Sequence, residues 1–267
     1  MKTVHILATV RKPELLPAAL LVFRTLRTGF PTAKICVWGN SLDSASFAAV
    51  ANECAKVNAQ LRNLAATSHD AWIESLIEES MSPFWICDTD MVFWDPVEEW
   101  FSVDAGQINF AGRYEPAFHE EWTDTVHVQR LHTCLMYLNP AKVRMAMREF
   151  MSRIPSPWGN TADFPFIRQH IVPVRGRLPL FYDSCTGMYH AIESAAFTEP
   201  MNQCFEHLHC ATYADALENK AFQEVHRRVY EDINAAKGLR ELQEKYYLER
   251  AVKEIPKRSK GKEANAV

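Results

Sequence analysis

The stretch Pro83–Pro96, PFWICDTDMVFWDP, most constrains how this chain can fold. Its apolar residues Phe84–Cys87 follow one another without the alternation of a strand that has one face in water. Such a run predicts a strand buried on both faces of a sheet. The run stops at Asp88-Thr89-Asp90, so two carboxylates follow the carboxyl end of a core strand. Open α/β sheets bind their ligands at that edge.

Asp88 and Asp90 are separated by one residue, so in an extended segment their side chains point the same way. Carboxylate oxygens are the ligands that hard divalent cations prefer, and an ion held there is able to bind a diphosphate. The pair therefore predicts a metal site. The alternative interpretation is a polar strand end with an Asp turn.

Length and composition restrict the class of protein. A chain of 267 residues with 48% hydrophobic content predicts one large domain around a real core. A net charge of −4 provides no overall field that attracts nucleic acid, so a nucleic-acid-linked acceptor would need a local patch such as the basic tail Lys257–Lys262. No stretch approaches the roughly 20 apolar residues of a membrane span. Seven cysteines, odd in number and mostly in apolar patterns, indicate reduced thiols, and we expect a cytoplasmic protein.

The first hundred residues alternate between strand and helix patterns. We expect strands at 4–10, 34–38 and 61–65, and the motif strand follows them directly. The expected helices between them are Glu14–Arg27, a helix capped by Asp43 or Ser44, and a helix that begins near Ser68–Asp70. This order predicts an α/β fold with a parallel, doubly wound sheet.

After the motif the expected pattern changes to a mixed sheet. Strands are expected at 107–112 and 130–138, with only loop material between them. Asn139-Pro140 begins a helix, with Asn as cap and Pro at the first helical position. A strand at 203–210 and a helical C-terminal segment follow.

Asp88-Thr89-Asp90 is similar to the DxD motif of the metal-dependent, nucleotide-sugar glycosyltransferases of the GT-A fold. Three further features make the chain resemble these enzymes. In the glycogenin-like members, an Asn-Ser-Gly-Val-Met-Leu-Ile-Asn-type strand and helix, an Asp in an acceptor-side loop and a late His follow the DxD. Here Leu131–Asn139, Asp163 and Phe205–Cys210 resemble these in order and rough spacing. His132-Thr133-Cys134 replaces the usual Asn-Ser-Gly.

The resemblance implies one GT-A-like (Rossmann-like) domain at 1–255 with a mixed, mainly parallel sheet. Its nucleotide-sugar-binding half would be 1–105, and its acceptor half with the C-terminal helices 106–255. We expect the polar tail 256–267 to be disordered. The implied donor is a UDP- or GDP-linked sugar held with Mn²⁺ or Mg²⁺, and the acceptor is a carbohydrate or another hydroxyl compound.

The resemblance also assigns roles to single residues. Asp163 is the candidate base that deprotonates an acceptor hydroxyl, with Asp183 in reserve. The residues expected at the nucleotide are Thr9, Arg11, His69, Asp70, Asp88, Thr89 and Asp90. For Asp70 the alternative is a helix N-cap. Whether the anomeric configuration is retained or inverted stays open.

We expect Asp88 and Asp90 to bind the ion together with His209. His207 and His209 would share a face of a strand at 203–210, so alternation alone does not choose between them. His209 is nearer the strand end, where ligands gather, and this favours it over His207, which would orient a neighbour.

Two other interpretations compete with the resemblance. The segment that begins at Asp88 also resembles the first motif of haloacid-dehalogenase-type phosphatases, in which Asp88 is a nucleophile and Asp90 a general acid. That interpretation demands a later acidic pair. A third possibility, from a non-enzymatic class, is a zinc-stabilised binding module built on Cys204, His207, His209 and Cys210.

Overall fold

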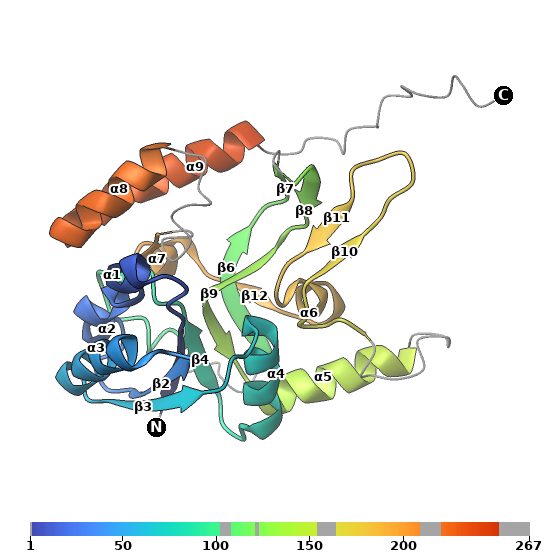
Figure 1. The fold of residues 1–267 in the computed structure, drawn as a ribbon. Coiled ribbons are helices and arrows are strands. Elements are labelled where there is room, and N and C mark those ends of the chain that lie inside the picture. Colours follow the sequence, from blue (N-terminus) through green and yellow to red (C-terminus); the bar gives the residue numbers. More distant parts are fainter. Residues whose placement is uncertain (1, 102–107, 121–122, 154–163, 209–219, 251–267) are drawn as a thin grey trace.

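The structure is a computed structural model that describes residues 2–101, 108–120, 123–153, 164–208 and 220–250. A seven-stranded sheet with the strand order β12-β6-β9-β4-β1-β2-β3 forms its centre (Figure 1). Every neighbouring pair in this sheet is parallel except those of β9, which runs antiparallel to both β4 and β6. The α/β fold with a mixed, mainly parallel central sheet is thus confirmed. The seven strands are β1 (Thr3–Ala8), β2 (Lys34–Asn40), β3 (Ala59–Leu64), β4 (Phe84–Cys87), β6 (Phe110–Glu115), β9 (Arg130–Leu138) and β12 (Ala195–Ala196).

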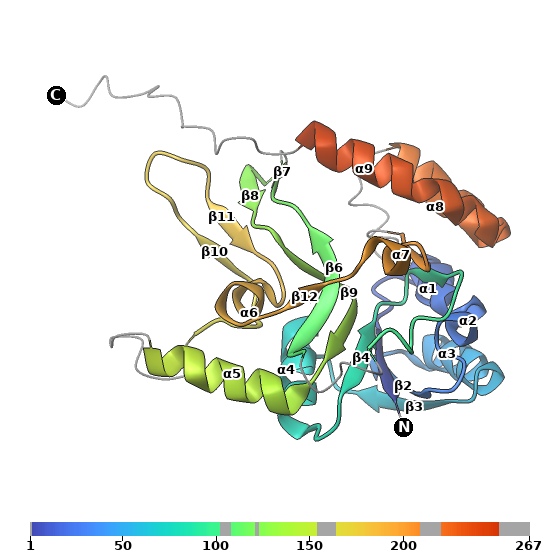
Figure 2. The ribbon, with the colours of Figure 1, turned by 180° about the vertical axis from the view of Figure 1, so that it is seen from behind.

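Two smaller sheets adjoin the central one. The larger has the order β10-β11-β8-β7 and ends in the β10–β11 hairpin, which projects from the rest of the protein in both views (Figures 1 and 2). The other pairs β5 with β13. Their strands are β5 (Met91–Phe93), β7 (Phe118–Glu120), β8 (Thr125–His127), β10 (His170–Val172), β11 (Leu180–Tyr182) and β13 (Phe205–His207). The strands β7 and β8 lie where only loop was expected, and the strand expected at 203–210 ends at His207 within the described residues.

Helices cover both faces of the central sheet. One core contains Trp85 and Cys87 with residues of the first helices, and the other contains Phe84 and Ile86 with residues of α4, α5 and α6. Strand β4 is therefore buried on both faces, as its unbroken apolar run predicts. The helices of eight or more residues are α3 (Ser44–Lys56), α4 (His69–Glu79), α5 (Pro140–Arg153), α8 (Lys220–Glu231) and α9 (Leu239–Arg250). The short ones are α6 (Thr186–Ala191), α7 (Glu199–Asn202) and the 3₁₀ helix η4 (Ile233–Gly238).

The prediction of one continuous helix at Glu14–Arg27 is wrong. The segment instead forms four short turns, because prolines interrupt its start and the amide of Val22 bonds outside it, to the carbonyl of Thr89 at 2.9 Å. These turns are η1 (Pro13–Leu15), α1 (Leu16–Ala19), η2 (Leu21–Arg24) and α2 (Leu26–Gly29). The expected cap of α3 is confirmed as Asp43, whose carboxylate accepts from the amide of Ser46 at 2.8 Å.

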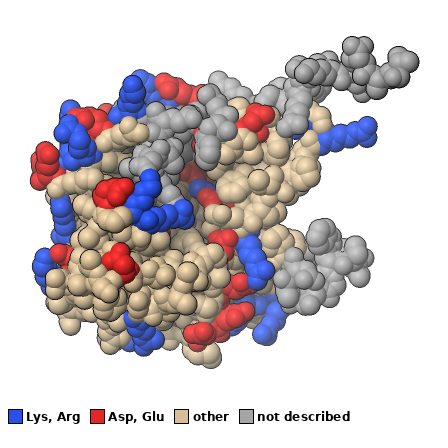
Figure 3. Space-filling view, in the orientation of Figure 1, with Lys and Arg blue, Asp and Glu red and all other residues tan. Residues whose placement is uncertain are grey.

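No single sign of charge dominates the face drawn in Figure 3, where basic and acidic side chains are interspersed. Among the described helices, none is long and apolar enough to cross a membrane. The tail 256–267 lies outside the described residues, and the division into halves at 105 and 106 stays a prediction.

Candidate metal and nucleotide site

The Asp88-Thr89-Asp90 turn follows β4 directly and is fixed by one backbone hydrogen bond for each of its residues. The amide of Asp88 donates to the carbonyl of Cys134 at 2.8 Å. The carbonyl of Thr89 accepts from Val22, and that of Asp90 accepts from the amide of Leu208 at 2.9 Å. Three separate parts of the chain therefore hold the two carboxylates at the edge where the parallel strands β1 and β2 also end.

His207 reaches this pair of acids from the far end of the chain. The antiparallel pairing of β13 with β5 sets His207 opposite Met91, the residue after Asp90. Its Nε2 atom lies 3.3 Å from Oδ1 of Asp90 and 4.0 Å from Oδ2 of Asp88. Asp88, Asp90 and His207 thus each offer a ligand atom, all within 4.8 Å of one another. Two carboxylates and one imidazole suit Mn²⁺ or Mg²⁺.

The two carboxylates differ in their affinity for protons. Burial, and next the negative charge of Asp90, raises the pKa of Asp88 to about 7. Burial acts the same way on Asp90, but the charge and hydrogen bond of His207 outweigh it and lower the pKa of Asp90 below its usual value. Like charges this close do not both ionise readily, so a cation that neutralises them binds favourably.

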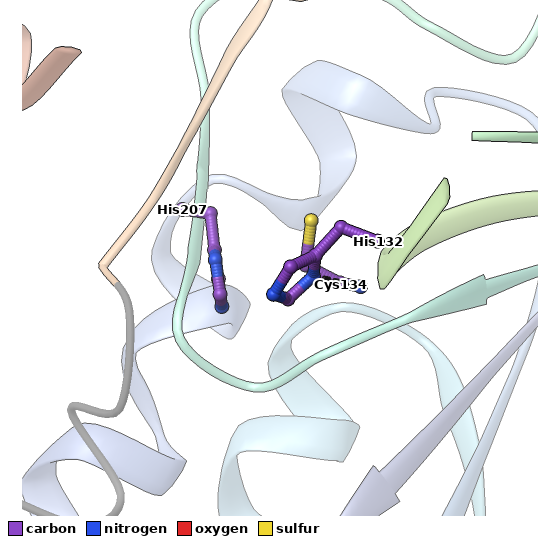
Figure 4. A group of neighbouring side chains, drawn as sticks. All are labelled: His132, Cys134 and His207. Atoms are coloured by element: carbon purple, nitrogen blue, oxygen red, sulfur yellow. Dashed lines mark hydrogen bonds between the residues drawn. The ribbon is translucent and has the colours of Figure 1, made fainter. Parts of the chain in front are cut away.

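A second group joins His207 to His132 and Cys134 of β9, and Figure 4 shows the His132 ring close to the other two side chains. Burial, and next His207, lowers the pKa of His132 well below its usual value, so the ring is neutral at pH 7. Its Nδ1 accepts from the amide of Cys134 at 3.0 Å, which leaves the proton on Nε2 and no lone pair there for a metal.

The thiol in this second group is equally unsuited to a metal. Burial, and next Asp88, raises the pKa of Cys134 well above its usual value, whereas the thiolate is the form that binds metals. The group of Asp88, Asp90 and His207 is therefore the better site for a hard divalent ion.

Three residues expected at the nucleotide lie near the same edge. Thr9 follows β1, and its hydroxyl accepts from the side chain of Asn40 at 3.3 Å. Arg11 is exposed two residues further on. His69 begins α4, with Nε2 3.8 Å from Asp88, and its ring stacks on Trp72.

Asp70 is not the N-cap of α4. Ser68 caps this helix instead, because its side chain accepts a hydrogen bond from the amide of Ala71 at 3.1 Å. The carboxylate of Asp70 instead accepts from the hydroxyl of Ser184 and from the amide of Gln169, the latter at 2.8 Å. It therefore ties the start of α4 both to the residue before β10 and to the segment after β11.

Sequence reasoning did not find the buried cation beside this segment, Arg130. Its Nε lies 2.7 Å from Glu115, and its Nη1 pairs with Asp183. Asp183 also accepts from Gln169 at 2.5 Å. The reserve candidate for a base is therefore held by several donors, which favours a positioning role. No local sequence pattern marks Arg130, since its partners come from β6 and from beyond β11.

Two sequence-predicted site residues, Asp163 and His209, lie outside the described residues. Cys204 and His207, from the proposed zinc module, both lie inside. Neither group of potential ligands among the described residues contains Cys204, whose sulfur is 3.4 Å from the carbonyl of Pro200. The other two members of that module, His209 and Cys210, lie outside the described residues, so the zinc module stays a prediction.

No protein-family model matches this chain, and no curated protein matches it either. Among solved structures it is similar to the bifunctional glycosyltransferase WbbM, with 12% identity, a TM-score of 0.40, and coverage of 57% of this chain and 34% of that one. The galactosyltransferase LgtC has 11% identity and a TM-score of 0.38, with 56% and 62% covered. A putative glucose-1-phosphate thymidylyltransferase from Bacillus anthracis has 7% identity and a TM-score of 0.44, with 85% and 96% covered.

This chain thus spans about a third of WbbM and under two thirds of LgtC. Because the sequence identities and TM-scores are low, the chemistry has to be argued from the geometry of the site.

Proposed function

We propose that the protein is a metal-dependent glycosyltransferase that moves a sugar from a nucleoside-diphosphate donor to a hydroxyl acceptor. The observation that carries this proposal is the meeting of Asp88, Asp90 and His207 at the carboxyl edge of the parallel strands. That edge is where open α/β sheets bind nucleotides. The DxD resemblance of the sequence supports the same conclusion.

The metal ligands that we propose are Asp88, Asp90 and His207, and the ion is Mn²⁺ or Mg²⁺. His209 remains the alternative third ligand. When bound, the ion supplies a positive charge that stabilises the diphosphate as its bond to the sugar breaks. The backbone bonds of the Asp88-Thr89-Asp90 turn keep both carboxylates oriented for this purpose.

The nucleotide of a UDP- or GDP-linked donor would lie toward Thr9, Arg11 and His69. Asn40 fixes the Thr9 hydroxyl, and the His69 ring packs on Trp72, so both side chains are oriented before a ligand arrives. Because Ser184 and Gln169 engage Asp70, we give that residue a positioning role. Asp163 stays the proposed acceptor base.

A hydrolysis screen tests this proposal, because water is able to replace the acceptor hydroxyl. Purified protein with Mn²⁺ is incubated with UDP- and GDP-linked hexoses, and free nucleoside diphosphate is measured. We expect slow release from at least one donor, lost in EDTA and in Asp90→Asn. Cleavage of p-nitrophenyl phosphate with phosphorylation of Asp88, and no release from any nucleotide sugar, would establish the phosphatase interpretation instead.

A further inference from the structure

The strand pair of β5 and β13 presents two different faces. Directly opposite residues of an antiparallel pair share a face, and successive residues along a strand alternate. His207 lies opposite Met91, and its Nε2 atom reaches Oδ1 of Asp90 at 3.3 Å. Val92 and Glu206, the next pair along, therefore face the other way. The strand pair has His207 on its front, toward the acids, and Glu206 on its back.

The C-terminal helices cover that back face. Figures 1 and 2 show α8 and α9 lying together along one side of the molecule. Val92 packs in one apolar cluster with Leu239, the first residue of α9. The ammonium of Lys237 lies 5.1 Å from the centre of the Trp94 ring, directly after β5. Glu206, which is 5% exposed, is thus a carboxylate buried on the side of these helices.

Arg240, in the first turn of α9, is the partner of this buried carboxylate. Its Nη2 atom lies 3.7 Å from Oε1 of Glu206. The same nitrogen donates to the carbonyl of Phe205 at 3.2 Å and to the carbonyl of Asn202, the last residue of α7. The Nη1 atom lies 3.6 Å from the exposed Glu199. One guanidinium therefore binds both backbone and side chain of β13, in the two residues before the proposed metal ligand.

A buried ion pair is weak evidence for stability, because the desolvation of two charges offsets most of their attraction. The best-attested effect of such a pair is to select one register. A slip of β13 by one residue would turn each of its side chains to the opposite face. Glu206 would then face Asp88 and Asp90, and His207 would face the cluster of Val92. The bonds of Arg240 oppose that slip.

We infer that Arg240 is a positioning residue, which fixes the register of β13 and thereby makes His207 the side chain that meets Asp88 and Asp90. The inference rests on the proposed metal site. It also couples ion binding to the docking of α9, because a contact that favours the ion is in turn favoured by the ion. Loss of a residue that orients a metal ligand typically costs about 10–100-fold in metal affinity.

A manganese titration followed by electron paramagnetic resonance tests the inference on the whole chain. Arg240→Met leaves the Glu206 carboxylate buried and unpaired, so both the thermal midpoint and the affinity for Mn²⁺ should fall. The double variant Arg240→Met/Glu206→Gln contains no unpaired charge, so its midpoint in EDTA should exceed that of Arg240→Met. Its affinity for Mn²⁺ should nevertheless stay about 10–100-fold below that of wild type. Lys245→Ala, at an exposed position of α9, should bind Mn²⁺ as wild type does.

The possible failures are distinguishable. Wild-type affinity for Mn²⁺ in both Arg240 variants, with loss in Asp88→Ala, overturns the inference and leaves the proposed metal site intact. Affinity that returns to the wild-type value in the double variant also overturns it, because Arg240 then acts on stability alone. Unchanged affinity in Asp88→Ala removes the metal site, and the inference with it.

Hydrogen exchange of wild type tests the coupling even where neither Arg240 variant folds. Mn²⁺ should slow exchange in α9 more than in α5, which packs in the other core of the central sheet. Equal effects of Mn²⁺ on α9 and α5 would contradict the coupling.

Discussion

Asp88 and Asp90 belong to one motif but meet different surroundings. The side chain of Asp88 is 29% exposed yet faces the negative charge of its neighbour, whereas the buried Asp90 has His207 at 3.3 Å. The pKa of Asp88 is therefore raised to about 7, and the pKa of Asp90 is lowered. Without a cation, the pair holds a proton on Asp88 through most of the acidic range.

This difference predicts how the ion-free protein responds to pH. A carboxyl with a raised pKa binds its proton more tightly in the folded state, so stability falls as pH rises from about 4 to about 7. In EDTA, the thermal midpoint of wild type should fall more between pH 5 and pH 8 than that of Asp88→Asn. Asp43→Asn, which alters an exposed cap, should follow wild type. Equal falls in wild type and Asp88→Asn would contradict the prediction.

A second prediction concerns the third ligand. The structure brings His207 to the acids, whereas sequence reasoning favoured His209. Removing a direct ligand should abolish most metal affinity, so His207→Ala should lose more Mn²⁺ binding than His209→Ala in a resonance titration. A larger loss in His209→Ala would restore the sequence-based assignment, and small equal losses would exclude both residues.

At the scale of residues, the sequence pointed to the two acids that we propose as ligands, but not to the side chains that the structure brings to them. Asp88 and Asp90 could be predicted because the apolar run of β4 points to them. The choice between His207 and His209 depends on where β13 meets β5, a pairing between distant segments that local alternation does not encode.

At the scale of elements, the expected helix at 14–27 shows where periodicity fails. The segment is apolar on most sides, which suits a helix packed in a core. One cause of the break in the helix, Pro13 and Pro17, is visible in the sequence. The other cause is a tertiary hydrogen bond from the amide of Val22 to the carbonyl of Thr89. That bond anchors the Asp88-Thr89-Asp90 turn, so the irregularity has a consequence for the candidate site.

A third prediction tests the close packing of α6. A Cβ atom added at Gly187 would lie 2.2 Å from the carbonyl oxygen of Pro165, and backbone cannot rotate away as a side chain can. Gly187→Ala should therefore lower the free energy of unfolding by about 1–3 kcal/mol. Gly238→Ala is the matched control, because nothing lies within 4 Å of the added atom. Urea denaturation with equal results for both variants would contradict the prediction.

At the scale of the whole molecule, the candidate site is where separate sheets meet. The central sheet supplies Asp88 and Asp90, and the β5–β13 pair supplies His207. The segment after β11 contributes Asp183, which pairs with Arg130 of the central sheet. The alternation of strand and helix patterns predicted the central sheet, but the attachment of the smaller sheets depends on buried long-range pairs that no sequence spacing displays.

The central claim is that Asp88 and Asp90 hold a divalent ion that binds a nucleoside diphosphate. Calorimetric titration of UDP and GDP, with Mn²⁺ and with EDTA, tests it most directly. Wild type should bind at least one of them only with Mn²⁺, and Asp88→Ala and Asp90→Ala should fold yet lose that binding. Affinity for UDP or GDP that is the same in both variants as in wild type, with or without Mn²⁺, would contradict the claim.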